Sequence, residues 1–177
     1  MAPRSSTLDL RELPLKGGER AQRRIPIEIA PLTLGGLRYD VLVDGDEATV
    51  TVSRVSGGYL VALHVKAAIY GPCSRCLREM SSTVDAGEEE FVPRNPADWS
   101  PEDVSPFIED LVVDVGGLAR ETVILALPPK LLCSEDCQGL CVVCGGVLND
   151  DRCTCEAEQT DPRWDKLKGL EAHSDEA

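Results

Sequence analysis

The sequence predicts an α+β fold. A mainly antiparallel, partly closed β-meander packs with one central helix and continues into a zinc-stabilised cysteine-rich segment and a short terminal helix. Apolar and polar residues alternate over residues 37–69, which is typical of strands with one buried face. Helical spacing dominates near residues 114–127. Six of the eight cysteines lie within residues 133–155, where apolar periodicity is almost absent and a hydrophobic core cannot form.

Residues 1–24 are predicted to form a flexible, locally basic arm. They are mostly polar, with six arginines or lysines beside three acidic residues, and Pro14 and Gly17–Gly18 interrupt them. Only the segment 8–13 is expected to anchor this arm. A basic arm of this kind is a candidate for contact with RNA phosphates.

Residues 25–130 are predicted to form the β-rich core domain. Alternating isoleucines indicate its first strand, and Pro26 favours an edge position because proline has no backbone donor. These isoleucines are Ile25, Ile27 and Ile29.

Two glycine-containing turns divide the alternating stretch into three strands. Asp44–Gly45 predicts a hairpin between strands over 37–43 and 48–53. Gly57–Gly58 predicts the next turn, before a longer strand over 59–69. Together they predict a meander.

The upstream cysteine pair is predicted to lie at the tip of a long hairpin. Gly71–Pro72 ends the third strand just before Cys73 and Cys76, and the next strand is indicated from near residue 80 toward residue 91. Such a loop can present two sulfurs from a rigid base. The four prolines within 93–106 predict a loop after this hairpin.

The central helix is predicted near residues 114–127, with Asp114 as its N-cap and Pro128–Pro129 after its end. Phe107–Ile108, before it, are expected to extend the sheet. The residues at helical spacing are Leu111, Val115, Leu118, Thr122 and Leu125.

The remaining chain is divided into three parts. Residues 131–160 are predicted to be the cysteine-rich zinc segment. A short helix is predicted over 161–170, because Asp161–Pro162 combines a capping residue with a proline at the first helical position. Residues 171–177 are predicted to be a disordered tail.

The eight cysteines are predicted to be ligands of two structural zinc ions. A tetrahedral zinc needs four soft donors, and two cysteines separated by two residues can bind one metal within a tight turn. Gly145 favours such a turn after Cys144, because a positive φ directs backbone N–H groups toward the sulfurs. One predicted site is Cys141, Cys144, Cys153 and Cys155; the other is Cys73, Cys76, Cys133 and Cys137.

Other arrangements of the same cysteines stay open. One zinc could take Cys133, Cys137, Cys141 and Cys144, or Cys73 and Cys76 could bind together with Cys141 and Cys144. Iron–sulfur ligation ranks after zinc, because the spacings differ from those of ferredoxins. A redox-active CxxC ranks third, because no thioredoxin-like βαβ pattern surrounds Cys73. Four thiolates leave no position for water, so the predicted sites are structural.

The charge indicates a basic partner. The formal net charge is −13, and two four-thiolate zinc sites would take it to about −17. A surface this negative repels nucleic-acid phosphates at long range and attracts basic proteins. A cytoplasmic location is expected, because the sequence has no secretory segment and no apolar run of about 18 residues that could span a bilayer. In a reducing compartment, cysteines at this spacing bind metal more often than they form disulfides.

No catalytic site is predicted. The sequence contains no HExxH, Walker A, GxSxG or GxGxxG motif. Its two histidines, His64 and His173, are expected to be solvated, and no small-molecule substrate is evident.

Five segments together resemble the YceD family. Cys73–Leu77 is similar to its C-x-R-C-L element, and the segment from Glu121 to Pro128 is similar to its E-x-x-[IV]-L-A-L-P element. The others are Leu8–Leu13, the run Cys133–Gly145 with Leu148–Asn149 and Cys153–Cys155, and Asp161–Leu167, which resembles a closing D-P-R-x-x-x-L.

This resemblance implies a large ribosomal RNA subunit accumulation protein, involved in 23S rRNA accumulation or processing and in assembly of the large (50S) subunit. The implied partner is a small basic ribosomal protein of the large subunit or a pre-50S particle. Direct rRNA binding through the arm, or an rRNA-processing enzyme, are the alternatives.

Overall fold

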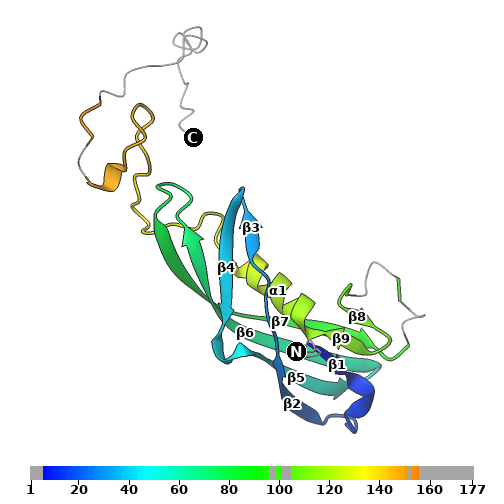
Figure 1. Cartoon of the computed structure of the whole chain (residues 1–177). Coiled ribbons are helices and arrows are strands. Elements are labelled where there is room, and N and C mark those ends of the chain that lie inside the picture. Colours follow the sequence, from blue (N-terminus) through cyan, green and yellow to red (C-terminus); the bar gives the residue numbers. More distant parts are fainter. Residues whose placement is uncertain (1–5, 96–98, 101–104, 151–152, 156–177) are drawn as a thin grey trace, which may run out of the picture.

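The computed structural model describes residues 6–95, 99–100, 105–150 and 153–155. In that part of the chain, six strands form a large antiparallel sheet and three short strands form a small one (Figure 1). The large sheet has the order β2-β5-β6-β4-β3, and β7 pairs with β6 as well. Its strands are β2 (Arg20–Pro26), β3 (Leu32–Leu34), β4 (Leu37–Val43), β5 (Glu47–Val55), β6 (Gly58–Pro72) and β7 (Glu79–Pro93).

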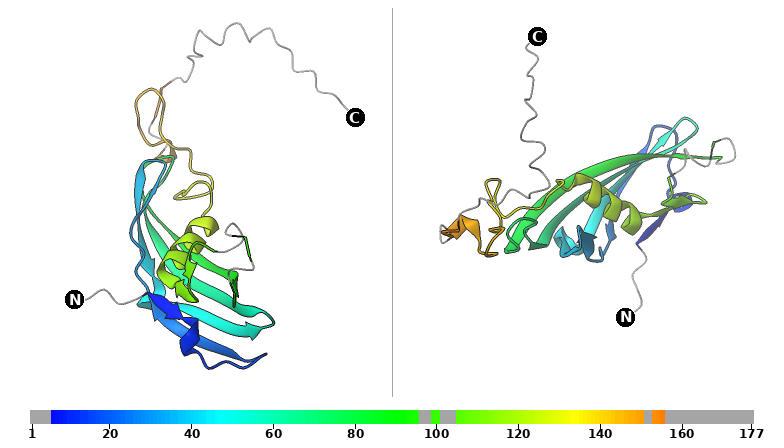
Figure 2. Two further views of the ribbon diagram at one scale, coloured as in Figure 1. Left: turned by 90° about the vertical axis from the view of Figure 1, so that its right-hand side faces the viewer. Right: turned by 90° about the horizontal axis from the view of Figure 1, so that it is seen from above.

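The buried face of the large sheet carries the helix α1 (Val115–Ala126). Along β6, alternate side chains from Val61 to Ile69 point to this face and are at most 4% exposed. Figure 2 shows α1 lying against the same face, where it contacts β6 and β7. The intervening residues His64 and Lys66 are exposed on the other face. The α+β class is therefore confirmed.

The hairpin predicted at Asp44–Gly45 is wrong. β4 and β5 both run antiparallel to β6 and pair with the same edge of it, β5 with its first half and β4 with its second half. The 3-10 turn η2 (Asp44–Asp46) joins them, and the positive φ angles of Gly45 and Asp46 produce a corner instead of a reversal. With 15 residues, β6 is long enough to pair with both strands in turn. The next turn is confirmed, since Val55 pairs with Gly58.

Much of the predicted arm belongs to the folded body. The strand β1 (Thr7–Asp9) pairs with β9 (Val112–Asp114), and Leu10 in the 3-10 helix η1 (Leu10–Glu12) is fully buried. Strand β2 already begins at Arg20, so the predicted boundary at residue 24 falls inside a strand. The expected anchoring by residues 8–13 is confirmed, whereas the expectation of a flexible arm is wrong for the strand that begins at Arg20.

The first predicted strand is shifted toward the N-terminus. β2 ends at Pro26, while Ile27 and Ile29 are buried beyond it. The predicted edge position is confirmed, because β2 pairs only with β5 in the described part of the chain.

The long hairpin with the CxxC at its tip is confirmed. β6 and β7 pair along their whole length, from Gly58 with Pro93 to Pro72 with Glu79. Arg94, Asn95, Trp99 and Ser100, which the structure describes within the predicted loop, lie in no helix or strand.

The helix is confirmed, with two changes around it. Asp114 caps it by accepting a hydrogen bond from the Gly117 backbone at 3.0 Å. Leu111 lies outside the helix. Val115, Leu118 and Thr122 are buried as predicted, whereas Leu125 is 68% exposed. The expected extension of the sheet by Phe107–Ile108 is wrong: β8 (Ile108–Glu109) pairs with β9 in the small sheet.

The helix predicted over 161–170 and the tail 171–177 lie outside the described residues. Among the residues that are described, no helix is long and apolar enough to cross a membrane.

Candidate metal centres

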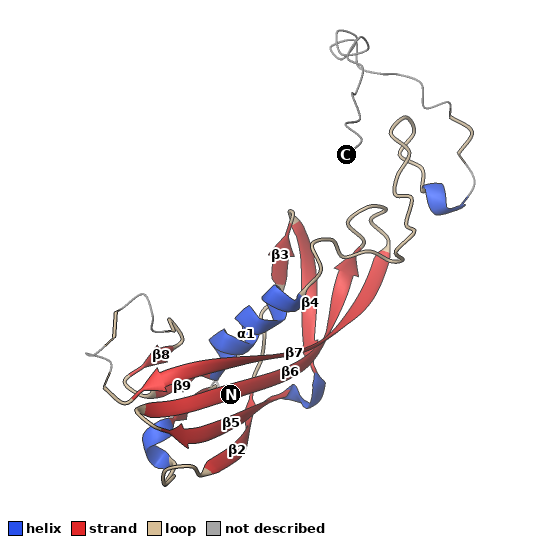
Figure 3. Cartoon of the chain, turned by 180° about the vertical axis from the view of Figure 1, so that it is seen from behind, coloured by secondary structure: helices blue, strands red, loops and turns tan. Residues whose placement is uncertain are grey.

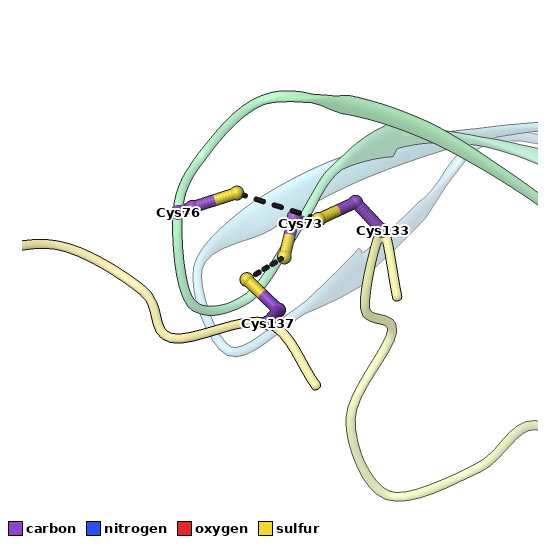
Figure 4. Close-up of side chains that lie close together, drawn as sticks. All are labelled: Cys73, Cys76, Cys133 and Cys137. Atoms are coloured by element: carbon purple, nitrogen blue, oxygen red, sulfur yellow. Dashed lines mark hydrogen bonds between the residues drawn. The ribbon is translucent and has the colours of Figure 1, made fainter. Parts of the chain in front are cut away.

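The tip of the β6–β7 hairpin meets the start of the cysteine-rich segment at a cluster of four sulfurs, here called the hairpin site (Figure 4). The Sγ atoms of Cys73 and Cys137 lie 3.7 Å apart, and those of Cys76 and Cys133 lie 3.6 Å apart. All four sulfurs lie within 4.8 Å of one another. Cys73, Cys76 and Cys137 are buried, whereas Cys133 is exposed.

A second cluster, here called the loop site, lies farther along the chain. It consists of Cys141, Cys144, Cys153 and Cys155, whose sulfurs also lie within 4.8 Å of one another. The Sγ atoms of Cys144 and Cys153 are 3.7 Å apart. Of its four cysteines only Cys141 is buried. The structure thus groups the eight cysteines as in the preferred arrangement, and in neither of the two alternatives.

Both CxxC pairs lie in turns of the same hydrogen-bond pattern. The backbone N–H two residues after the first cysteine donates to its sulfur, from Arg75 to Cys73 at 3.5 Å and from Val143 to Cys141 at 3.4 Å. The residue after the second cysteine has a positive φ in each turn, 60° at Leu77 and 70° at Gly145. Such turns hold two sulfurs on one side of the backbone, as a shared metal requires.

Direct hydrogen bonds fasten the cysteine-rich segment to the hairpin tip. Both the backbone N–H and the hydroxyl of Ser74 donate to the carbonyl oxygen of Leu131, at 2.8 and 2.7 Å. The guanidinium of Arg75 donates to the carbonyl oxygen of Cys137 at 2.7 Å. These hydrogen bonds hold the hairpin tip and the segment that follows α1 next to each other without a bound ion.

The sulfur spacing fits a single tetrahedral ion. With Zn–S bonds of about 2.3 Å, the edges of a regular ZnS₄ tetrahedron are about 3.8 Å long, close to the measured 3.6 and 3.7 Å. A disulfide needs an S–S distance of about 2.05 Å, and the eight cysteines, all of which the structure describes, are free. The donor set therefore suits one soft ion in each cluster.

Backbone donors favour negative charge on one sulfur of each CxxC. At Cys141 the N–H groups of Cys144 and Val143 lower the pKa to about 6. At Cys73 burial acts in the opposite direction, but the N–H groups of the following turn outweigh it and the pKa is also lowered to about 6. A thiolate is the form that binds metal.

Neighbouring sulfurs oppose further ionisation in each cluster. Cys76 and Cys137 raise the pKa of Cys133 to about 12. Cys153 and Cys144 raise the pKa of Cys155 to about 12. Thiolates this close repel one another, and a bound dication would remove that repulsion.

Two residues next to the hairpin site were missed by sequence reasoning. The side-chain amide of Asn149 donates to Cys137 Sγ at 3.3 Å. Arg78, at the base of the hairpin tip, forms an ion pair with Asp150. The only signal for the role of Asn149 was that Leu148–Asn149 belong to the family pattern. Asn149 and Cys137 are too far apart in the sequence for a local pattern to link them.

The histidines offer no comparable cluster in the described residues. His64 lies exposed on the open face of the sheet, where its Nε2 is 2.7 Å from a carboxylate oxygen of Asp85. The hollow beside it has mixed charge, because Arg24, Lys66, Asp44 and Glu47 all line it. His173 lies outside the described part of the chain.

Comparison with known proteins agrees with four of the five sequence segments, since Leu8–Leu13 precedes the residues that the family model matches. The model of the family described as "Large ribosomal RNA subunit accumulation protein YceD" matches residues 61–171, more than half of the chain. Similar chains include uncharacterized proteins of Mycobacterium tuberculosis and Mycobacterium bovis, each 33% identical over 147 residues, which is 81% of this chain and 67% of the relative. No solved structure matches. The resemblance inferred from the motifs is confirmed.

Proposed function

The chain belongs to the YceD family, and from that premise we propose that it is a non-enzymatic, zinc-binding assembly factor. It supports 23S rRNA accumulation and the biogenesis of the large ribosomal subunit. The family supplies the link to large-subunit RNA, while the two sulfur clusters support the metal.

Sulfur geometry carries the metal part of the proposal. All four sulfurs of each cluster lie within 4.8 Å, whereas a polynuclear iron–sulfur cluster would hold its thiolates farther apart, because its own atoms lie between them. When bound, a zinc ion supplies charge neutralisation and a tetrahedral cross-link. Four protein ligands leave no position for a substrate, so the cross-link is structural.

The charge of β7 supports a basic protein partner. This strand carries no lysine or arginine, and its five acidic residues are Glu79, Asp85, Glu88, Glu89 and Glu90. Asp85 is paired with Lys66 at 2.9 Å, which leaves Glu88, Glu89 and Glu90. Glu89 is exposed, whereas Glu88 and Glu90 are half-buried and Glu88 accepts a hydrogen bond from Thr122 at 3.0 Å. In the described part of the chain, no strand pairs with the outer edge of β7 (Figure 3). A small basic ribosomal protein of the large subunit, free or in a pre-50S particle, is the partner that suits this edge.

The opposite edge of the sheet favours a second candidate function, direct contact with rRNA. β2 has three exposed arginines, Arg20, Arg23 and Arg24, and no acidic residue. β2 and β7 lie at opposite edges of the four-strand region β2-β5-β6-β7 (Figure 3). Three cations are few for RNA binding, so this contact would be auxiliary.

A pull-down from bacterial lysate at low and high salt tests the proposal. At low salt the wild type should recover ribosomal proteins or pre-50S particles of the large subunit, and salt should weaken the recovery. Changing Glu88, Glu89 and Glu90 together to glutamine should reduce it. A control changes three exposed acids away from both sulfur clusters, as Glu12→Gln, Glu28→Gln and Glu47→Gln. Recovery of no large-subunit component by the wild type would refute the proposal.

A further inference from the structure

The loop that closes the loop site also touches the hairpin site. Asn149 lies between Cys144 and Cys153 in the sequence, within the 3-10 turn η5 (Leu148–Asp150). Its side-chain nitrogen is 3.3 Å from Cys137 Sγ and 4.0 Å from Cys133 Sγ. One residue of the loop site's own connection therefore contacts two sulfurs of the other cluster.

Hydrogen bonding fixes the orientation of the Asn149 amide. The backbone N–H of Gln138, which can only donate, points at Asn149 Oδ1 at 2.7 Å. The Nδ2 group must then face the sulfurs, and a thiolate can only accept. The interaction is thus a donor–thiolate contact whose direction does not depend on the assignment of the amide atoms.

Further contacts hold η5 against the hairpin site. The Leu148 backbone N–H donates to the Gly139 carbonyl at 2.9 Å, and Leu140 and Val147 form an antiparallel bridge. Asp150 pairs with Arg78, the last residue of the hairpin tip. The connection from Cys144 to Cys153 is therefore attached to the hairpin site at its middle and to the loop site at both ends.

We propose that Asn149 is a positioning residue that couples the two metal sites, so that ion binding at the loop site strengthens ion binding at the hairpin site. This inference rests on the metal binding proposed above. Closing the loop site fixes both ends of the connection, which holds the Asn149 amide on the thiolates of Cys137 and Cys133. Coupling of this kind is reciprocal, so binding at the hairpin site strengthens the loop site by the same factor.

Two substitutions separate the donor from the rest of the side chain. Asn149→Asp keeps an oxygen for the Gln138 N–H but replaces the donor with a negative charge facing two thiolates. Asn149→Ala removes both interactions. Loss of a hydrogen-bond partner of a metal ligand costs about 10–100-fold in metal affinity. We expect Asn149→Ala to lose this much metal affinity at the hairpin site and Asn149→Asp to lose more. Gln138→Ala is the control, because it keeps the backbone N–H that donates to Asn149.

The experiment titrates the full-length chain with Co²⁺ and then displaces it with Zn²⁺ against a competing chelator. The hairpin site is measured alone in Cys153→Ser, and the loop site alone in Cys73→Ser. We expect the hairpin site to lose affinity in Cys153→Ser, and Asn149→Ala to add little further loss in that background, because both changes remove the same support.

Three results would overturn the inference. Equal metal affinities of the hairpin site in the wild type and in both Asn149 variants would show that the Asn149 amide does not support this site. Full additivity of Asn149→Ala and Cys153→Ser would remove the coupling while leaving two zinc sites in place. Absence of any tetrahedral thiolate–Co²⁺ absorption in the wild type would overturn the metal proposal and the coupling with it. Unchanged far-UV circular dichroism of the variants shows that the β-domain remains folded.

Discussion

Gly71 lies where strands β4 and β6 approach each other, two residues before Cys73. A Cβ atom at this position would overlap the ring of Tyr39 and lie 2.8 Å from the carbonyl oxygen of Arg38. Tyr39 is 1% exposed and cannot move into solvent without uncovering the core. Replacing Gly71 with alanine must therefore push β4 and β6 apart next to the hairpin site.

The expected loss of stability follows from two opposing terms. Overpacking a well-filled interior costs about 1–3 kcal/mol. Alanine recovers about 0.5–1 kcal/mol, because glycine loses more backbone entropy in a strand. The net prediction for Gly71→Ala is a loss of about 0–2.5 kcal/mol in the free energy of unfolding, centred near 1 kcal/mol. The shift also displaces Cys73 relative to the other three sulfurs, so zinc affinity at the hairpin site should fall.

Urea denaturation of the zinc-loaded protein measures the first effect, and chelator competition measures the second. Gly17→Ala is the matched control, because no atom lies within 4 Å of a Cβ built there and its φ is not positive. A Gly71→Ala protein as stable as the Gly17→Ala protein would show that β4 and β6 are not tightly packed at this point. The packing argument would then be wrong.

Three other predictions concern the helix, the hairpin tip and an ion pair. Asp114→Ala should lower the free energy of unfolding by about 1 kcal/mol, because the first turn of α1 loses its cap; urea denaturation should show no such loss for the exposed Asp136→Asn. Leu77→Gly should stabilise the hairpin tip by about 1 kcal/mol, because Leu77 has a φ of 60° that costs a branched side chain but not glycine; a thermal unfolding midpoint no higher than that of the wild type would contradict this. The Lys66 ammonium holds the pKa of Asp85 below its ordinary 3.8 in the folded chain. The Asp85–Lys66 pair therefore contributes stability above pH 4, and this contribution is lost as the pH falls through the lowered pKa of Asp85. Asp85→Asn should flatten this part of the curve of stability against pH.

Local sequence patterns correctly predicted those elements whose structure depends on residues nearby in the sequence. The β6–β7 hairpin, the capped helix after Asp114 and the turn at Gly57 all follow from residues within a few positions. The grouping of the sulfurs was predicted as the preferred one of three arrangements. The CxxC turns and four donors per ion left the pairing open, and the contact of the hairpin tip with Cys133 and Cys137 selects one arrangement.

The failures share one physical cause, a partner far away in the sequence. Asp44–Gly45 has good hairpin chemistry, yet both flanking strands pair with β6, whose length decides the topology. The stretch that begins at Arg20 looked like part of a polar arm but pairs with β5 as strand β2. Asn149 lies 12 residues after Cys137 and donates to its sulfur. No local pattern contains these contacts.

The central claim is that two four-thiolate zinc sites exist and that one of them joins the hairpin tip to the cysteine-rich segment. Native mass spectrometry of the wild type and of the Cys73→Ser and Cys153→Ser variants, each purified with zinc, tests it most directly. Two zinc ions in the wild type and one in each variant are predicted. Two ions retained by Cys73→Ser would contradict the claim, because loss of one of its four thiolates should cost the hairpin site its ion.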